Sequence, residues 1–257
     1  MQKETSPEEF VGANSLLLDC EKDSDVWQGL LSQAEPYVPQ ENQPLSFVLP
    51  VPEQNVSMIF YQDTHYYYPK QTFTTLKIYE KAHNFLDYSV LTKVLRRFNC
   101  FGHYRMPMVS FTSVLFPLGK PNHTAWINPF EILELKEEGP FTWIYFCNGP
   151  AIKVPLTSQT IRNYTENALV ILATVARDHF STGMIGPVSP LSVLGIPDTP
   201  FARSLSQRPK LQKFPLPLRL LKEAYEKELA LQTILRFGYQ SGLEHWNHQT
   251  FYDLFDQ

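Results

Sequence analysis

The sequence contains no run of about 18 consecutive apolar residues, the minimum that a membrane-spanning helix requires. Its polar, acidic start, MQKETSPEEF, is followed by no apolar stretch of the kind that a secretory signal carries. Cysteine is scarce, and Cys20, Cys100 and Cys147 form no CxxC pair, which argues against a disulfide framework and a zinc knuckle. We therefore expect a cytoplasmic chain with no membrane partner, no metal and no cofactor.

The familiar catalytic patterns are also missing, because the sequence contains no GxSxG, HExxH, P-loop or GxGxxG motif. His103 and His123 flank a predicted strand, and His245 and His248 lie close together, but no Cys or Asp is spaced to complete a metal site with either pair. Cys100 has Arg and His neighbours that can lower the pKa of a thiol, although the role of a small buried apolar side chain is favoured. We expect no catalytic residue and no enzyme activity.

The composition is that of a packed protein with stiff connections. Hydrophobic residues make up 43% of the 257 residues and aromatic residues 14%, so the chain can bury a sizeable core as one large domain or two small ones. Proline (21) outnumbers glycine (11). A chain rich in proline and aromatics favours strands joined by rigid turns over a helical bundle.

The pattern of apolar residues predicts an α+β fold with a mixed, mainly antiparallel sheet, a long helix packed on it and a C-terminal amphipathic helix. Strands are expected over residues 56–61, 75–80, 108–116, 123–128, 130–136, 141–146 and 151–156. Helices are expected over residues 25–32, 86–99, 158–180 and 218–237, the second of them capped by Asp87.

Three regions are expected along the chain. Residues 1–55 are acidic and poorly periodic, and we expect a loosely packed extension. Residues 56–182 form the predicted core, and residues 183–257 hold a loop rich in Pro and Gly, a basic segment and the last helix. That helix either pairs subunits or packs on its own domain, through Leu221, Tyr225, Leu229 and Ile234.

The net charge of −4 hides a segregation of charge along the chain. Residues 1–60 hold 10 acidic and 2 basic side chains, whereas the remainder holds 16 acidic and 20 basic ones. Residues 91–120 and 203–222 contain bases and no acid. A solvated face normally carries both signs, so these segments indicate an anionic partner such as DNA, or an intramolecular one. Residues 1–55 are a candidate internal competitor that folds back on the basic face.

The loop LGKPNH, residues 118–123, lies between two apolar stretches and projects Lys120 and His123. Pro117 and Pro121 restrict the backbone at its two ends. A loop that is already rigid loses little conformational entropy when it enters a groove.

Five short motifs follow one another along residues 73–180. They are Phe101-Gly102, Phe116-Pro117, Trp126-Ile127, the turn Asn148-Gly149 and Val154-Pro155-Leu156. In their order and spacing they resemble the competence transcription factor ComK family. The resemblance implies an activator of genes for DNA uptake, which binds paired A-tracts of double-stranded DNA through the minor groove as a multimer. It also implies a homo-oligomer and RNA polymerase as partners.

A second likeness lies in the segment RPKLQKFPLPLR. It resembles the basic segment centred on Phe through which that family is handed to the MecA adaptor and the Clp protease. Phe214 and Leu216 fit this adaptor-binding pattern, whereas Pro215 and Pro217 depart from it.

Bases from both acid-free segments are the candidate DNA contacts, because a narrow A-tract groove has an enhanced negative potential that attracts Arg and Lys. The first candidates are Lys93, Arg96, Arg97, Arg105, Lys120 and His123, and the second are Lys210, Lys213 and Arg219. The alternative is a non-enzymatic protein-interaction module, or a diverged relative without DNA binding. The net acidity and the aromatic run at residues 66–68 favour that alternative.

Overall fold

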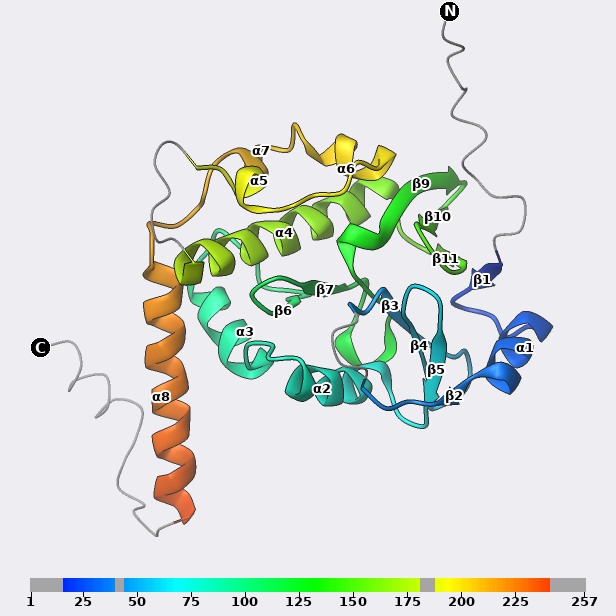
Figure 1. The fold of residues 1–257 in the computed structure, drawn as a ribbon, viewed down its shortest axis with the longest axis horizontal. Helices are drawn as coiled ribbons and strands as arrows, with labels where there is room; N and C mark the ends of the chain where they lie inside the picture. The colour runs from blue at the N-terminus through cyan, green and yellow to red at the C-terminus, as the bar shows by residue number, and fades with distance from the viewer. Residues whose placement is uncertain (1–15, 40–43, 181–187, 241–257) are drawn as a thin grey trace, which may run out of the picture.

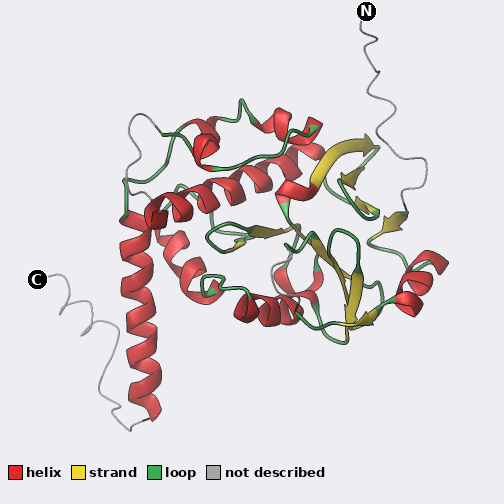
Figure 2. Ribbon diagram, viewed as in Figure 1, coloured by secondary structure: helices red, strands yellow, loops and turns green. Residues whose placement is uncertain are grey.

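The computed structural model describes residues 16–39, 44–180 and 188–240, and it has the predicted α+β fold (Figure 1). Two sheets form its centre, and helices pack around them (Figure 2). The mixed, mainly antiparallel pairing and the long packed helix are both present, so the predicted fold class is confirmed.

The larger sheet has seven strands in the order β2-β5-β4-β3-β8-β7-β6. Neighbouring strands run antiparallel except β2 and β5, which are parallel. The strands are β2 (Glu35–Pro36), β3 (Phe47–Pro50), β4 (Ser57–Phe60), β5 (His65–Tyr68), β6 (Met108–Val109), β7 (Val114–Pro117) and β8 (Trp126–Ile127).

The smaller sheet has four strands in the order β1-β11-β10-β9, of which only β1 and β11 are parallel neighbours. They are β1 (Leu17–Asp19), β9 (Ile132–Glu138), β10 (Phe141–Phe146) and β11 (Ala151–Val154). Every second residue of β10 is buried, as the alternation of its sequence predicts. Phe146 stacks on Phe47 of β3 with ring centroids 4.1 Å apart, which joins the two sheets.

The turn between β10 and β11 requires its glycine. Gly149 has φ +87°, a left-handed conformation that other residues adopt at a cost. A Cβ atom at Gly149 would lie 3.5 Å from the ring of Phe47, an ordinary van der Waals contact, so the backbone conformation and not a lack of space requires glycine.

The helices surround these sheets. The α-helices are α1 (Asp25–Gln33), α2 (Thr72–Ala82), α3 (Tyr88–Arg97), α4 (Ser158–Phe180), α5 (Pro190–Val193), α6 (Pro200–Leu205), α7 (Pro209–Gln212) and α8 (Leu220–Gln240). Two short 3₁₀ helices are η2 (Pro121–His123) and η3 (Pro129–Glu131).

Helix α4 is the central helix of the molecule. It lies between the segment containing α5 to α7 and strand β7, and it also contacts α8 (Figure 1). Its apolar stripe, including Ile161, Leu169 and Leu172, is buried in the main core. Glu137 of β9 accepts hydrogen bonds from the backbone and hydroxyl of Ser158, so a carboxylate from the sheet caps the helix N-terminus.

The strand predicted for residues 75–80 is wrong, because these residues form the middle of α2. Thr72, Thr75, Leu76 and Tyr79 are buried, and this spacing of three and four residues is the period of a helix. The apparent alternation over TLKIYE covers less than two helical turns, so a short window could not separate the two periods.

The prediction of a loosely packed extension over residues 1–55 is wrong for its described part. Strand β3 lies inside the larger sheet, between β4 and β8. Trp27 of α1 is fully buried, and its Nε1 donates to the carbonyl of Asp19 at 3.0 Å. The expected boundary at residue 55 falls within the β3–β4 hairpin, so deleting residues 1–55 would remove strands from both sheets.

The C-terminal region also departs in part from expectation. Within the loop predicted for residues 183–201, residues 190–193 form α5 and α6 begins at residue 200, while residues 183–187 lie outside the described residues. Leu221 and Tyr225 of α8 are buried on the body of the same chain, whereas Leu229 and Ile234 are exposed. Within the described ranges, no helix is both long enough and apolar enough to cross a bilayer.

Replacing Asp87 tests the predicted cap of α3. Its side chain accepts from the backbone N–H groups of Ser89 (2.8 Å) and Val90 (3.1 Å). Partial burial opposes ionisation, but hydrogen bonds to the carboxylate prevail, and the pKa of Asp87 lies below its ordinary value. We expect Asp87→Ala to cost about 1 kcal/mol in urea unfolding at pH 7.

The contribution of Asp87 should also depend on pH. A carboxyl whose pKa is lower in the folded state stabilises the fold above the unfolded pKa of about 4 and loses that effect as pH falls through the folded value. The gap between wild type and Asp87→Ala should therefore narrow at acidic pH. Asp87→Asn, which keeps a capping oxygen without the charge, is the control, and a gap that widens in acid would contradict the assignment.

Candidate nucleic-acid interface

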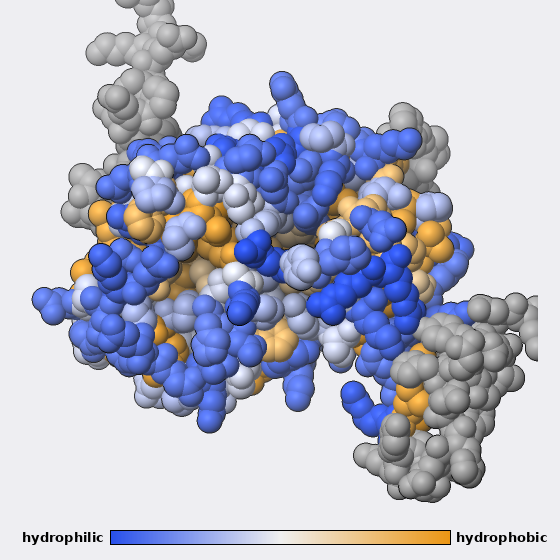
Figure 3. All heavy atoms as spheres, turned by 180° about the vertical axis from the view of Figure 1, so that it is seen from behind, coloured by the Kyte–Doolittle hydropathy of each residue, from blue (hydrophilic) through white to orange (hydrophobic). Residues whose placement is uncertain are grey.

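The predicted DNA contacts do not form one continuous patch. The structure divides them among α3, the loop and turn beside η2, and the segment that leads from α7 to α8. Figure 3 shows one face of the molecule, where hydrophilic side chains cover most of the surface and apolar side chains gather in separate patches. The three groups of bases therefore have different surroundings.

The bases of α3 are engaged with α8. Lys93 Nζ lies 2.7 Å from Glu228 Oε1, and Arg97 Nη2 lies 2.5 Å from Glu228 Oε2. The Glu228 side chain is fully buried, whereas those of Lys93 and Arg97 are 39% and 41% exposed. A buried carboxylate requires such partners, because an uncompensated charge in the interior is strongly unfavourable. Arg96, the third base of this helix, is exposed.

Lys210 is held on α4 by a second buried carboxylate. Glu166 accepts from the backbone N–H of Lys210 at 3.0 Å and pairs with Arg208 Nη2 at 2.7 Å. The ammonium group of Lys210 donates to Asn167 Oδ1 at 2.6 Å. Of the predicted bases in this region, Lys213 and Arg219 are exposed.

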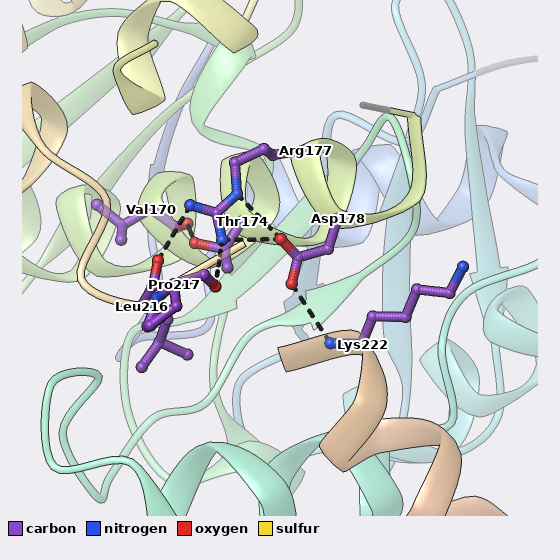
Figure 4. Close-up of polar contacts among 7 residues, drawn as sticks. All are labelled: Val170, Thr174, Arg177, Asp178, Leu216, Pro217 and Lys222. Atoms are coloured by element: carbon purple, nitrogen blue, oxygen red, sulfur yellow. Dashed lines mark hydrogen bonds and ion pairs between the residues drawn. The ribbon is translucent and has the colours of Figure 1, made fainter. Parts of the chain in front are cut away.

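The segment predicted to bind an adaptor is docked on α4 (Figure 4). Arg177 donates to the carbonyl of Leu216 at 3.1 Å and to that of Pro217 at 3.0 Å. Its guanidinium also pairs with Asp178 at 2.8 Å and lies 4.1 Å from the ring centroid of Phe214. Phe214 and Leu216 are half-buried, so in this state the segment is part of the folded body.

The loop of residues 118–123 is held rigidly, and its two basic side chains face solvent. The hydroxyl of Thr72 donates to the carbonyl of Asn122 at 3.0 Å, and Trp126 Nε1 donates to that of Pro121 at 2.9 Å. Lys120 and His123, three residues apart in this loop, are exposed.

Arg105 lies beside this loop. Its guanidinium is 4.5 Å from the ring centroid of Tyr164 on α4 and donates to the Tyr164 hydroxyl. Arg105, Gly119 and His123 line one cleft of about 310 Å³, which also has Glu21 at its rim. Its apolar lining includes Pro50, Leu118, Ala125, Val154, Pro155 and Leu156. Of the predicted DNA contacts, Arg105 and His123 thus line one cleft, and Lys120 is exposed next to Gly119 of that lining.

The structure does not support a reactive thiol at Cys100 or a metal site at His103 and His123. Burial raises the pKa of the Cys100 thiol, which opposes the activation that its neighbours suggested. His103 and His123 are both exposed, and the part of the chain that the structure describes contains no group of three metal-ligating side chains. His245 and His248 lie outside the described residues.

Sequence reasoning missed two kinds of residue. It did not identify Glu166, Asp178 and Glu228 as partners of the bases, because the pairs that these acids form are set by tertiary contacts. It also passed over Tyr104, which is 88% exposed beside Arg105. An aromatic residue between His103 and Arg105 is a pattern that the sequence does show.

No protein-family model, curated protein or solved structure matches this chain.

Replacing the bases of α3 and replacing Glu228 of α8 should lower the free energy of unfolding by different amounts. Replacing Lys93 and Arg97 together by Met is expected to destabilise the fold by about 2–4 kcal/mol, because the buried Glu228 carboxylate loses two cations. Glu228→Gln should cost less, since the cations that it leaves reach water. Urea unfolding measures both costs, with Arg96→Met as the matched control, and equal costs would contradict the asymmetry.

Arg177→Lys tests the docking of residues 213–219. Lysine keeps the charge but cannot reproduce a planar fork that donates to two carbonyls and a carboxylate at once. We expect faster amide exchange across residues 213–219 and faster tryptic cleavage after Lys213. Arg203→Lys, at a position where the side chain is 68% exposed, is the control. Unchanged protection in Arg177→Lys would show that other contacts hold the segment.

Proposed function

We propose that this chain is a sequence-specific DNA-binding protein that activates transcription of competence genes. The observation that carries the proposal is that Arg105 and His123, from two separate segments, line one cleft, while Lys120 is exposed next to Gly119 of the same lining. Two cationic side chains and an imidazole on these two segments are suited to phosphates and to a narrow A-tract minor groove.

The resemblance to the ComK family supports the same proposal from the sequence. Its motifs coincide with the elements around the cleft: Phe116-Pro117 ends β7, and the Val154-Pro155-Leu156 motif contributes its three residues to the lining. On this proposal the chain binds paired A-tracts as a homo-oligomer and contacts RNA polymerase in the cytoplasm. A MecA-type adaptor would need the segment around Phe214 to leave its place on Arg177.

The contributions of the individual bases follow from their contacts. In this proposal Arg105 and Lys120 make the main contacts with DNA, and the exposed Arg96 adds a contact with phosphate. Lys93 and Arg97 keep their ion pairs with Glu228 when DNA binds, because breaking both pairs would remove two cations from a buried carboxylate. Lys213 and Arg219 are exposed on either side of the docked segment and are secondary candidates for contacts with phosphate.

The second candidate, a protein-interaction module, has one specific observation in its favour. A cleft of about 460 Å³ opens beside the second half of α4, and its lining is largely apolar. Its aromatic residues are Phe111, Phe130 and Phe180. Apolar clefts suit partner side chains rather than phosphates, so binding through it would depend weakly on salt.

A gel-shift titration over a series of salt concentrations separates the two functions. A duplex with two A-tracts is compared with a GC-rich duplex of equal length. DNA binding predicts preference for the A-tracts and affinity that falls steeply with salt. Each of Arg105→Ala and Lys120→Ala should lower the slope of log affinity against log salt by about one.

Arg203→Ala is the control for this titration, because Arg203 is an exposed base on α6 that pairs with Asp198. It should leave affinity and slope unchanged. Absence of binding to either duplex at low salt would overturn the DNA-binding proposal and favour the interaction module. Equal slopes for wild type, Arg105→Ala and Lys120→Ala would show that DNA binds elsewhere on the molecule.

A further inference from the structure

A strained turn between α3 and β6 presents one aromatic side chain to solvent. Gly102 and Arg105 both have positive φ, +78° and +55°. For a non-glycine residue such as Arg105 this conformation is unfavourable, and strain of this kind is concentrated at functional sites. Between the two positions lie His103 and Tyr104, both exposed.

Tyr104 is 88% exposed, more than any other large hydrophobic side chain that the structure describes. Single exposed aromatics are common and need no function by themselves. This one differs in its surroundings, because His103 and Arg105 flank it in sequence and Arg105 lines the cleft shared with Gly119 and His123. Tyr104 is therefore the direct sequence neighbour of one of the cations proposed to contact DNA.

The base of the turn is fixed on the body. Phe101 and Met106, on either side of the turn, are each 2% exposed. The guanidinium of Arg105 lies over the Tyr164 ring of α4, which ties the turn to the central helix. A ring presented on such a base loses little conformational entropy on contact with a ligand.

We propose that Tyr104 inserts between base pairs from the minor groove, at a flexible pyrimidine–purine step beside an A-tract. The proposal rests on the DNA-binding function proposed above and specifies a kinked duplex as the ligand. A-tracts are stiff, whereas TA steps unstack easily, so a rigid ring enters where unstacking costs least. Side chains that insert from the minor groove bend DNA toward the major groove.

Insertion and phosphate contact have different signatures. Stacking of an aromatic side chain on a base involves no charge, so it releases no counterion. Tyr104→Ala should weaken affinity about 10-fold while leaving the salt slope unchanged, whereas Arg105→Ala should lower the slope. An aromatic in contact with phosphates alone would not show this combination.

The experiment uses the full chain and a duplex with 2-aminopurine at a TA step beside an A-tract. Wild type should raise the fluorescence of this base analogue as the step unstacks, and end-labelled duplex should show bending by energy transfer. Tyr104→Ala should abolish both signals, and Tyr104→Trp should retain them. Leu220→Ala is the control, because Leu220 is an exposed apolar side chain at the start of α8 that lines neither cleft.

Each outcome decides between the two proposals. Duplex binding with loss of both signals in Tyr104→Ala supports insertion. Duplex binding that Tyr104→Ala leaves unchanged overturns insertion and keeps the DNA-binding function. If wild type binds only the single strand, insertion into a duplex is wrong, and if it binds neither form, both proposals fail together.

Discussion

Buried carboxylates hold the C-terminal part of the chain to the body of the molecule. Glu166 and Asp178 of α4 and Glu228 of α8 are almost fully buried, and each is paired with a basic side chain. Removing such a charge from water is costly unless a cation and hydrogen bonds compensate it. The position of α7, the docked segment around Phe214 and the seating of α8 all depend on these pairs.

This constraint changes the meaning of the basic segments. Charge segregation left open an external anion or an intramolecular partner, and Lys93, Arg97 and Lys210 have partners within the fold. Arg105 and Lys120 differ because neither forms an ion pair with a carboxylate among the described residues. Arg105 lies on the Tyr164 ring, and its segment and that of Lys120 meet at a cleft where the acidic side chain on the lining is Glu21. The proposed interface is therefore smaller than the sequence indicates, and it includes an exposed aromatic ring.

Much of the fold was predictable because its signals are local. The alternation in β10, the glycine turn at residue 149 and the cap at Asp87 each depend on a few consecutive residues. The errors arose where a short window was ambiguous, as in α2, or where burial came from distant strands. The acidic first 55 residues lacked periodicity, but β3 lies between β4 and β8. Its pairing with β4 is a local hairpin, whereas its pairing with β8 joins strands far apart in the sequence, which no local pattern reveals.

The sequence by itself determined the fold class, most of the elements and the rigidity of the loop that carries Lys120, since periodicity, capping and proline act over short distances. Only the tertiary structure decided which bases remain available to a ligand. Arg97 and Glu228 are 131 residues apart, and Arg208 and Glu166 are 42 apart. The pairing of such charges depends on burial and on the docking of helices, which are properties of the packed chain.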